Sequence, residues 1–250
     1  MRTTAFSIDT FYQQIGNGPI IVLLHGWGHS WETWNNLIPF LSSDFQLLIP
    51  DLPAFGQSKS PSNPQKWNSE KYVLWLDEFL KQTTNNKKII LVGHSLGGKI
   101  AALYSATYPS QIKKLFLISP SGIPDKLSFC KKIQKKVFSM IPHIAKQIMP
   151  QKLKNKLLER TGASADYLNA SPSQKTILNN IIQENITQFL HKISAPTFLF
   201  WGILDQETPY KNHQIFLENI ANAELIKFNT GHFPYVENEI EFKKELIKRI

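Results

Sequence analysis

The sequence predicts an α/β fold, with a mostly parallel eight-stranded sheet, helices flanking it and a helical cap inserted into the chain. The main observation is that short apolar runs alternate with helical patterns along most of the chain. The alternation stops after Ser119-Pro120-Ser121-Gly122 and resumes at Ser194-Ala195-Pro196, which marks the insertion. A chain of 250 residues is long enough to form one such domain with a large core.

Buried strands are predicted where short apolar runs are bounded by turn residues. Six such runs occur, at Ile20–Leu24, Phe45–Ile49, Ile89–Val92, Leu115–Ile118, Thr197–Trp201 and Leu225–Phe228. Helical patterns lie between them, at Trp31–Leu41, Ser69–Gln82, Leu96–Tyr108, Tyr210–Ile220 and Glu237–Arg249. This alternation favours parallel strands with helices on both faces of the sheet. Ala5–Ile8 and Phe11–Gln14 predict an additional antiparallel pair at one edge.

The predicted insertion divides the chain into a core, residues 1–121 and 196–250, and a cap, residues 122–195. Apolar residues recur at helical spacing between Leu127 and Ile148, so the cap is expected to be helical. Cys130 falls within this pattern and is interpreted as a small apolar helix residue.

Positive charge is concentrated in the same segment. Residues 122–193 carry 12 Lys/Arg against four Asp/Glu, whereas the rest of the chain carries 16 against 15. Clustered charge of one sign attracts oppositely charged ligands, so the cap is expected to favour an anionic or acyl-carrier-bound ester. Lys131, Lys132, Lys135 and Lys136 would carry much of this effect, unless they form only a solvated surface. The segment lacks a recognisable nucleic-acid fold signature.

Other features of the composition limit the classes of protein to which this chain could belong. The first residues contain no apolar signal segment, and no apolar run reaches the roughly 18 residues of a membrane span. The single cysteine, Cys130, cannot form an internal disulfide, which favours a cytoplasmic protein. Neither zinc-ligand spacing nor a phosphate-binding glycine motif is present, so no metal or cofactor is expected.

The most informative motif is Gly93-His94-Ser95-Leu96-Gly97-Gly98. It lies between a predicted strand and a predicted helix, the context in which a G-x-S-x-G sequence forms a sharp turn that exposes its serine. Ser95 is therefore the candidate nucleophile. A serine hydroxyl is weakly nucleophilic on its own and needs a base, an orienting acid and an oxyanion hole.

His232 is the candidate base because it follows the last predicted strand, and active groups of such sheets gather beyond the carboxyl ends of the strands. Asp205, which follows the preceding strand, is the candidate acid that would orient the imidazole. The chain order Ser95, Asp205, His232 is the order expected for this turn. Asp125 and Glu207 are alternative acids. The neighbouring His94 should point away from Ser95.

Two backbone N–H groups are expected to form the oxyanion hole. Leu96 N–H lies at the start of the helix after Ser95, and Trp27 N–H lies in the glycine-containing loop His25-Gly26-Trp27-Gly28. The Trp27 side chain is also expected to wall the substrate pocket. Asp51, after another strand, is interpreted as a turn residue, with Gly56 at a positive φ.

These motifs together resemble the α/β-hydrolase superfamily over essentially the whole chain. The matching segments are His25-Gly26-Trp27-Gly28, Asp51-Leu52-Pro53, Gly93-His94-Ser95-Leu96-Gly97-Gly98, Trp201-Gly202 with Asp205, and Gly231-His232-Phe233. The resemblance implies a Ser–His–Asp enzyme that needs no cofactor and carries a helical cap over its site. The first two segments are also similar to those of the methyl esterases that act on pimeloyl-acyl carrier protein.

The function expected from these features is hydrolysis of carboxylic esters through an acyl-serine intermediate. A pimeloyl-acyl carrier protein methyl ester esterase, a C–C bond hydrolase and an acyltransferase use the same triad and remain alternatives. A ligand-binding member of the fold without catalytic activity is a further alternative, because fold does not determine function.

Overall fold

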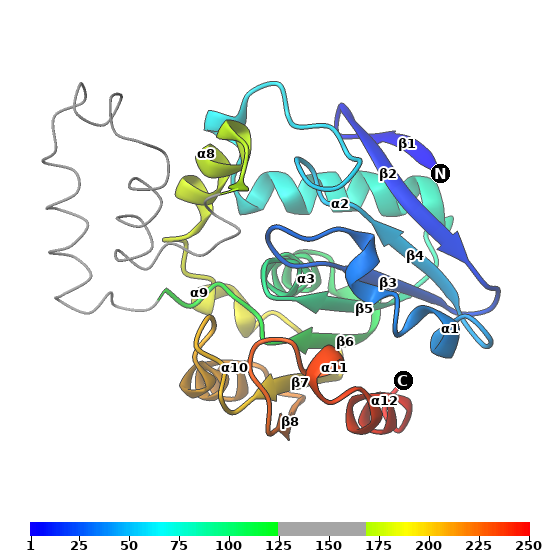
Figure 1. The fold of residues 1–250 in the computed structure, drawn as a ribbon, viewed down its shortest axis with the longest axis vertical. Coiled ribbons are helices and arrows are strands. Elements are labelled where there is room, and N and C mark those ends of the chain that lie inside the picture. The colour runs from blue at the N-terminus through cyan, green and yellow to red at the C-terminus, as the bar shows by residue number, and fades with distance from the viewer. Residues whose placement is uncertain (125–168) are drawn as a thin grey trace, which may run out of the picture.

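The computed structural model describes residues 1–124 and 169–250, and it confirms the predicted eight-stranded, mostly parallel sheet flanked by helices (Figure 1). The strands lie in the order β1-β2-β4-β3-β5-β6-β7-β8. Strands β1 and β2 are antiparallel to their neighbours, and the other pairs are parallel. The strands are β1 (Arg2–Ala5), β2 (Ile8–Ile15), β3 (Ile20–Leu24), β4 (Gln46–Pro50), β5 (Ile89–His94), β6 (Ile112–Ile118), β7 (Thr197–Gly202) and β8 (Ala223–Phe228).

Helices connect these strands. The described α-helices are α1 (Ile38–Leu41), α2 (Ser69–Thr84), α3 (Leu96–Thr107), α8 (Pro172–Ile181), α9 (Thr187–Leu190), α10 (His213–Asn219), α11 (Pro234–Glu237) and α12 (Glu239–Ile247). Short 3-10 helices are η1 (Trp31–Trp34), η2 (Pro64–Lys66), η3 (Pro109–Gln111) and η4 (Tyr210–Asn212).

The core lies in two layers, one on each face of the sheet. Successive side chains of a strand point to opposite faces, so Ile20, Val22 and Leu24 of β3 join one apolar cluster. Ile21 and Leu23 join the other cluster. Helices α2 and α3 cover the first face, whereas α1 and α12 cover the second (Figure 1). Burial on both faces explains why the central strands are continuous apolar runs rather than alternating ones.

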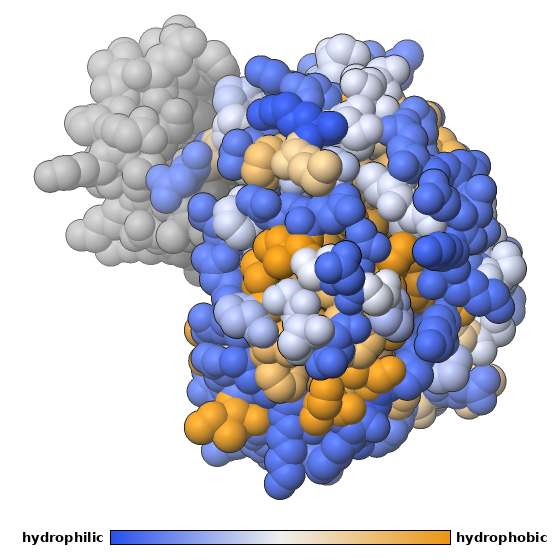
Figure 2. All heavy atoms as spheres, turned by 90° about the vertical axis from the view of Figure 1, so that its right-hand side faces the viewer, coloured by the Kyte–Doolittle hydropathy of each residue, from blue (hydrophilic) through white to orange (hydrophobic). Residues whose placement is uncertain are grey.

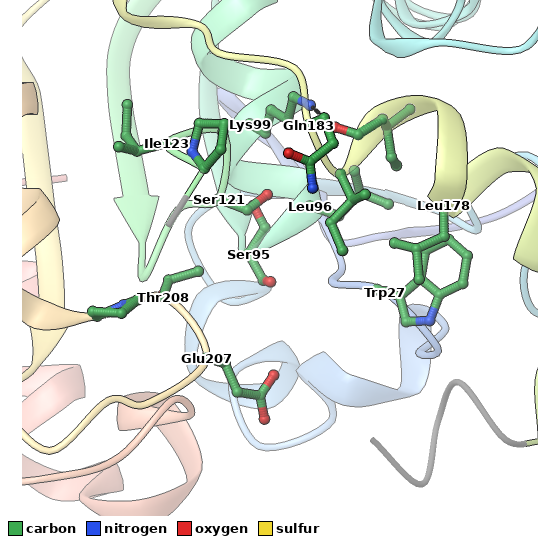
Figure 3. A pocket seen from close by; sticks show the side chains of 15 residues that line it. Trp27, Ser95, Leu96, Lys99, Ser121, Ile123, Leu178, Gln183, Glu207 and Thr208 are labelled. Atoms are coloured by element: carbon green, nitrogen blue, oxygen red, sulfur yellow. Dashed lines mark hydrogen bonds between the residues drawn. The ribbon is translucent and has the colours of Figure 1, made fainter. Parts of the chain in front are cut away.

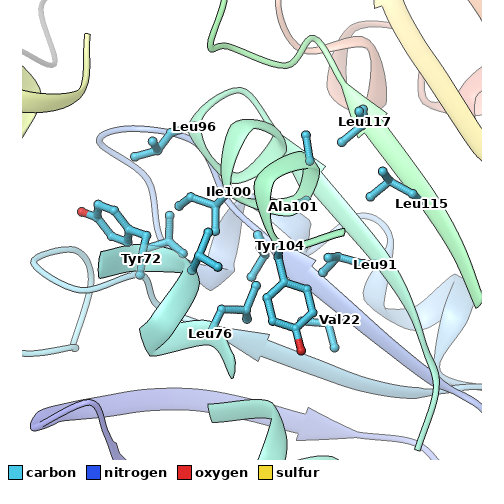
Figure 4. Packing of buried hydrophobic residues seen from close by; sticks show 14 of the residues in the cluster. Val22, Tyr72, Leu76, Leu91, Leu96, Ile100, Ala101, Tyr104, Leu115 and Leu117 are labelled. Atoms are coloured by element: carbon cyan, nitrogen blue, oxygen red, sulfur yellow. The ribbon is translucent and has the colours of Figure 1, made fainter. Parts of the chain in front are cut away.

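Helix α3 lies at the centre of the first layer. Its side chains Ile100 and Tyr104 pack between the sheet and α2, facing Leu91 of β5 and Leu76 of α2 (Figure 4). The start of α3 is therefore held at the carboxyl end of β5, where the motif residue Ser95 lies.

The predicted antiparallel pair at the edge of the sheet is present, but its turn lies within Ala5–Ile8 and not between this run and Phe11–Gln14. Ala5 pairs with Ile8, so Phe6 and Ser7 form a two-residue hairpin turn inside the run predicted as a strand. Both turn residues have positive φ, 49° and 61°. Two-residue hairpin turns usually contain Asn or Gly, which adopt positive φ readily, but neither residue occurs in this turn. The Phe6 ring packs edge-on against Trp67, an apolar contact made from within the turn.

Three predicted helices are each divided in two. The segment Trp31–Leu41 forms η1 and α1 with residues 35–37 between them, because α1 begins only at Ile38, with Pro39 in its first turn. Tyr210–Ile220 begins as η4 before α10. The predicted helix Glu237–Arg249 begins with the last residue of α11 and continues as α12, with Asn238 in a non-helical conformation, φ −141° and ψ 64°, between them. The period of apolar residues continues through such breaks, which is why the sequence pattern did not reveal them.

The two ends of the described part of the insertion meet at the core. The N–H of Ile186 donates a 3.0 Å hydrogen bond to the carbonyl of Gly122. Helix α9 packs against α3 and α10. The cap boundaries at 122 and 195 remain a prediction. The residues Cys130, Lys131, Lys132, Lys135 and Lys136 lie outside the described residues.

The face of the molecule that includes the β1–β2 edge is largely hydrophilic, with apolar groups separated by polar ones (Figure 2). Within the ranges 1–124 and 169–250, no helix has the length and hydropathy needed to cross a bilayer.

Gly97 allows the closest approach between α3 and the sheet, and its replacement should destabilise the fold. A Cβ atom at this position would lie 2.2 Å from the carbonyl oxygen of Leu24 and 2.6 Å from that of His25. Both are backbone atoms, so this clash could be removed only if α3 moved relative to the end of β3. We expect Gly97→Ala to lower the free energy of unfolding by about 3 kcal/mol in urea titrations. Thr107→Ala, at the exposed end of α3, should change it by less than about 0.5 kcal/mol; equal effects would refute this explanation.

Candidate active site

Ser95 occupies a strained turn between β5 and α3. Its φ is 51° and its ψ is −112°, which residues other than glycine rarely adopt. The turn is possible because Gly93 and Gly97 lack side chains: a Cβ on Gly93 would lie 2.3 Å from the Gly97 carbonyl oxygen. The predicted elbow geometry is therefore present.

The backbone of Ser95 is fixed by the β6 end of the sheet and by its own helix. Its N–H donates to the carbonyl of Ile118 at 3.0 Å. Its carbonyl accepts hydrogen bonds from the N–H groups of Lys99 and Ser121, each at 3.0 Å, and from the Ser121 hydroxyl at 3.2 Å. A strained residue persists only where its surroundings hold it, and these bonds provide that restraint.

Asp205 and His232 are brought together, although 27 residues separate them in sequence. The Nδ1 of His232 lies 2.8 Å from Oδ2 of Asp205, and both side chains are buried. This bond places the proton on Nδ1 and leaves Nε2 of the neutral imidazole able to accept one.

The remaining contacts of Asp205 hold its carboxylate in place. Oδ1 accepts the N–H groups of Glu207 and Thr208 at 2.9 and 3.0 Å, and Oδ2 lies 2.8 Å from the Thr208 hydroxyl. Burial acts to raise the pKa of Asp205, but the hydrogen bond and charge of His232 and the Thr208 N–H outweigh it, so the pKa lies below its ordinary value. The carboxylate is thus held ionised. Thr208 was not predicted; its signal is only its position three residues after Asp205.

Ser95, Trp27 and Leu96 line one cavity of about 340 Å³ at the carboxyl ends of the strands (Figure 3). Glu207 and Thr208, from the loop after β7, line the same cavity. Among the described residues no hydrogen bond joins Ser95 to His232. Such a bond is often long in a free enzyme and tightens when substrate binds.

Glu207 lies on the opposite side of the imidazole from Asp205. Its Oε2 is 3.6 Å from Nε2 of His232, whereas Nδ1 is bonded to Asp205. Of the carboxylates of Asp205 and Glu207, that of Asp205 is therefore the one placed to orient the ring. Asp125, the other alternative acid, lies outside the described residues.

The two N–H groups predicted to stabilise an oxyanion are available. Within the described part of the chain, neither Trp27 N–H nor Leu96 N–H forms a hydrogen bond. The Leu96 group is unpaired because it begins α3, where the first N–H groups of a helix have no internal acceptor. The Trp27 side chain walls the cavity and packs edge-on against Phe55, with ring centroids 4.9 Å apart.

His25 fixes the loop that carries Trp27. Its Nδ1 donates to the carbonyl of Gly26 at 2.8 Å, and its Nε2 accepts the N–H of Leu52 at 2.9 Å. Burial lowers the pKa of His25 to about 4, so the ring is neutral and can accept as well as donate. The loops after β3 and β4 are thereby joined.

The neutral state of His25 should make stability depend on pH. The unfolded chain binds a proton at His25 below pH 6.5, but the folded protein does so only near pH 4. The unfolded state therefore holds more protons in this window, and stability falls as pH decreases. We expect His25 to contribute a loss of about 2 kcal/mol between pH 7 and pH 5, measured by urea unfolding. His25→Gln should remove that part of the slope and the exposed-site control His191→Gln should not; the same slope in all three proteins would contradict this role.

The side chain of His94 supports the loop of His232, and its orientation away from Ser95 stays a prediction. Its Nε2 donates to the backbone carbonyl of His232 at 2.9 Å, and its Nδ1 faces the Tyr235 hydroxyl at 3.4 Å. Burial, with the nearby charge of His232, lowers the pKa of His94 well below its ordinary value. No sequence pattern predicted this supporting contact, which joins residues 138 positions apart.

An ion pair between the buried Lys99 and the partly exposed Glu184 also escaped prediction. Nζ of Lys99 donates to Oε2 of Glu184 at 2.7 Å and to the carbonyl of Ile181 at 2.8 Å. Burial lowers the pKa of Lys99, and the Glu184 bond opposes that shift. The pair ties α3 to the chain that follows α8.

Asp51 has the structural role predicted for it. Its two carboxylate oxygens accept the N–H groups of Trp31 and Gln57, each at 2.7 Å. Gly56 has a φ of 52°, and a Cβ there would lie 2.2 Å from the Asp51 carboxylate. The Asp51 carboxylate thus holds the loop after β4 in place by hydrogen bonds to the backbone.

Comparisons with known proteins agree with this architecture. The family model described as alpha/beta hydrolase fold matches residues 19–239. A pimeloyl-[acyl-carrier protein] methyl ester esterase of Wigglesworthia glossinidia brevipalpis is 29% identical over 94% of this chain and 95% of its own length. Human monoacylglycerol lipase ABHD6 is 25% identical over 95% of this chain and 77% of its own. The crystal structure of a hydrolase from Pseudomonas aeruginosa PA01, 18% identical, superposes with a TM-score of 0.78 over 99% of this chain and 97% of its own, and shares the fold.

Proposed function

Because this chain belongs to the alpha/beta hydrolase family, we propose that it is a serine hydrolase that cleaves carboxylic esters through an acyl intermediate on Ser95. The observation that carries this proposal is the combination of a strained serine at the cavity with a buried Asp205–His232 pair. Relatives named as esterases and lipases support an ester substrate.

In the proposed reaction, Ser95 Oγ attacks the ester carbonyl while Nε2 of His232 accepts its proton. Asp205 holds the ring in the required tautomer and stabilises the imidazolium. The N–H groups of Trp27 and Leu96 donate to the oxyanion. His232 then protonates the leaving alcohol. In the second half of the reaction, His232 accepts a proton from a water molecule that attacks the acyl carbonyl, and it returns the proton to Ser95 Oγ as the acid is released.

The acyl group would occupy the cavity lined by Trp27, Leu178 and Ile182, and the carrier-protein ester is the specific substrate we favour. The 29% identical relative, which matches along nearly its full length, supports this choice. The basic segment 122–193 is consistent with an acidic carrier.

Hydrolysis of p-nitrophenyl esters of increasing acyl length, beside an acyl-carrier-protein methyl ester, tests the proposal. We expect Ser95-dependent hydrolysis of both kinds of ester, with the higher kcat/KM for the carrier-bound ester. Ser95-dependent hydrolysis of free esters alone would leave the esterase mechanism standing but refute the carrier substrate. No hydrolysis of any ester would refute the esterase proposal itself.

A further inference from the structure

Glu207 places a negative charge beside the reacting end of the cavity. Its side chain extends from the loop after β7 into the cavity that Ser95 lines (Figure 3). The side chain is 63% exposed. Its backbone N–H is bonded to Asp205 at 2.9 Å, which fixes the start of the side chain. The carboxylate is therefore held near His232 yet accessible to a ligand.

This charge is not neutralised by the other charged residue of the cavity. Among the described lining residues, Lys99 and Glu207 are the two with charged side chains. Lys99 is paired with Glu184 at 2.7 Å. The ion pairs and hydrogen bonds of the described residues give the Glu207 carboxylate one partner, His232 Nε2 at 3.6 Å, which is beyond hydrogen-bond distance.

The position of this partner determines which part of a substrate would meet Glu207. In the function proposed above, Nε2 of His232 delivers a proton to the oxygen of the leaving alcohol, which must come within about 3 Å of it. Glu207 Oε2 is 3.6 Å from the same nitrogen. In this arrangement the first atoms of the alcohol beyond the ester oxygen would lie next to the carboxylate. The acyl group would extend from Ser95 toward the apolar wall formed by Trp27, Leu178 and Ile182.

We propose that Glu207 determines selectivity for the leaving alcohol: it accepts a small neutral alcohol such as the methanol of the favoured carrier ester, disfavours an alcohol with a negative charge close to the ester oxygen, and favours one with an ammonium or hydroxyl group there. This inference rests on the proposed serine esterase function. A hydrogen-bond donor there meets the carboxylate in a charge-assisted contact. An alcohol that carries a carboxylate at the same place is repelled, and solvent exposure of Glu207 keeps both effects moderate.

Four butyrate esters that differ only in the alcohol test this selectivity. The alcohols are propanol, ethylene glycol, protonated 2-(dimethylamino)ethanol and glycolate, which are neutral, hydroxyl-bearing, cationic and anionic. For the unmodified protein at low salt we expect kcat/KM to be about tenfold higher for the cationic ester than for the anionic one, with the hydroxyl ester above the propyl ester. The ratio should shrink as salt screens the charge.

Glu207→Gln removes the charge and keeps the side-chain shape, so it should reduce the cationic-to-anionic ratio to less than about threefold. Glu218→Gln, which removes an exposed charge on α10 outside the cavity, is the matched control and should leave the ratio unchanged. An equal ratio in the unmodified and Glu207→Gln proteins, with Ser95-dependent hydrolysis intact, would overturn the role of Glu207 alone. Hydrolysis that is absent, or that persists in Ser95→Ala, would overturn the proposed function and this inference together.

Discussion

Alanine in place of Ser95 should abolish ester hydrolysis, with a loss in kcat on the order of 10⁶-fold if the residues act as a unit as in other serine triads. The attacking oxygen is the only atom removed, and the hydrogen bonds that fix residue 95 are made by its backbone. The fold should therefore be retained, and circular dichroism and urea unfolding should match those of the unmodified protein. Steady-state hydrolysis of a p-nitrophenyl ester measures the loss.

Ser110→Ala provides the matched control, because Ser110 is exposed beyond the far end of α3 and outside the cavity lining. It should retain full activity. A folded Ser95→Ala protein with the turnover of the Ser110→Ala control would show that hydrolysis does not use Ser95.

Asparagine in place of Asp205 should lower kcat on the order of 10⁴-fold, the size of effect seen when a triad carboxylate loses its charge. The amide preserves the shape of the side chain but can no longer hold the His232 proton on Nδ1 by a carboxylate bond, which is 2.8 Å long here. The ring would then favour the tautomer with Nε2 protonated, which cannot accept the serine proton. The measurement is kcat at saturating ester concentration.

Asp44→Asn, at an exposed position outside the cavity lining, should leave kcat unchanged. A loss of less than tenfold in Asp205→Asn would identify another acid. One alternative acid is Glu207, which would have to act from the Nε2 side of the ring. The other is Asp125, which is not among the described residues.

The sheet and the principal site residues could be predicted because they depend on local patterns. Parallel buried strands are continuous apolar runs, and their carboxyl ends meet at one edge, so the turns after them had to contain Ser95, Asp205 and His232. The strained elbow was also predictable, because Gly93 and Gly97 permit it.

Contacts between distant segments could not be predicted from such patterns. The bond from His94 to the His232 carbonyl and the pair of Lys99 with Glu184 depend on how loops pack, and each joins residues far apart in the chain. The hairpin turn at Phe6 was missed for a different reason. Its residues lack the usual turn chemistry, and the fold holds them at positive φ.

Mass spectrometry after reaction with a fluorophosphonate tests the activation of Ser95 most directly, because this reagent forms a stable adduct with an activated serine. We expect one adduct per chain on the peptide that contains Ser95, loss of ester hydrolysis in proportion to labelling, and no adduct in Ser95→Ala. Adduct formation on a different residue, or full hydrolytic activity in protein that the reagent does not label, would contradict the proposed mechanism.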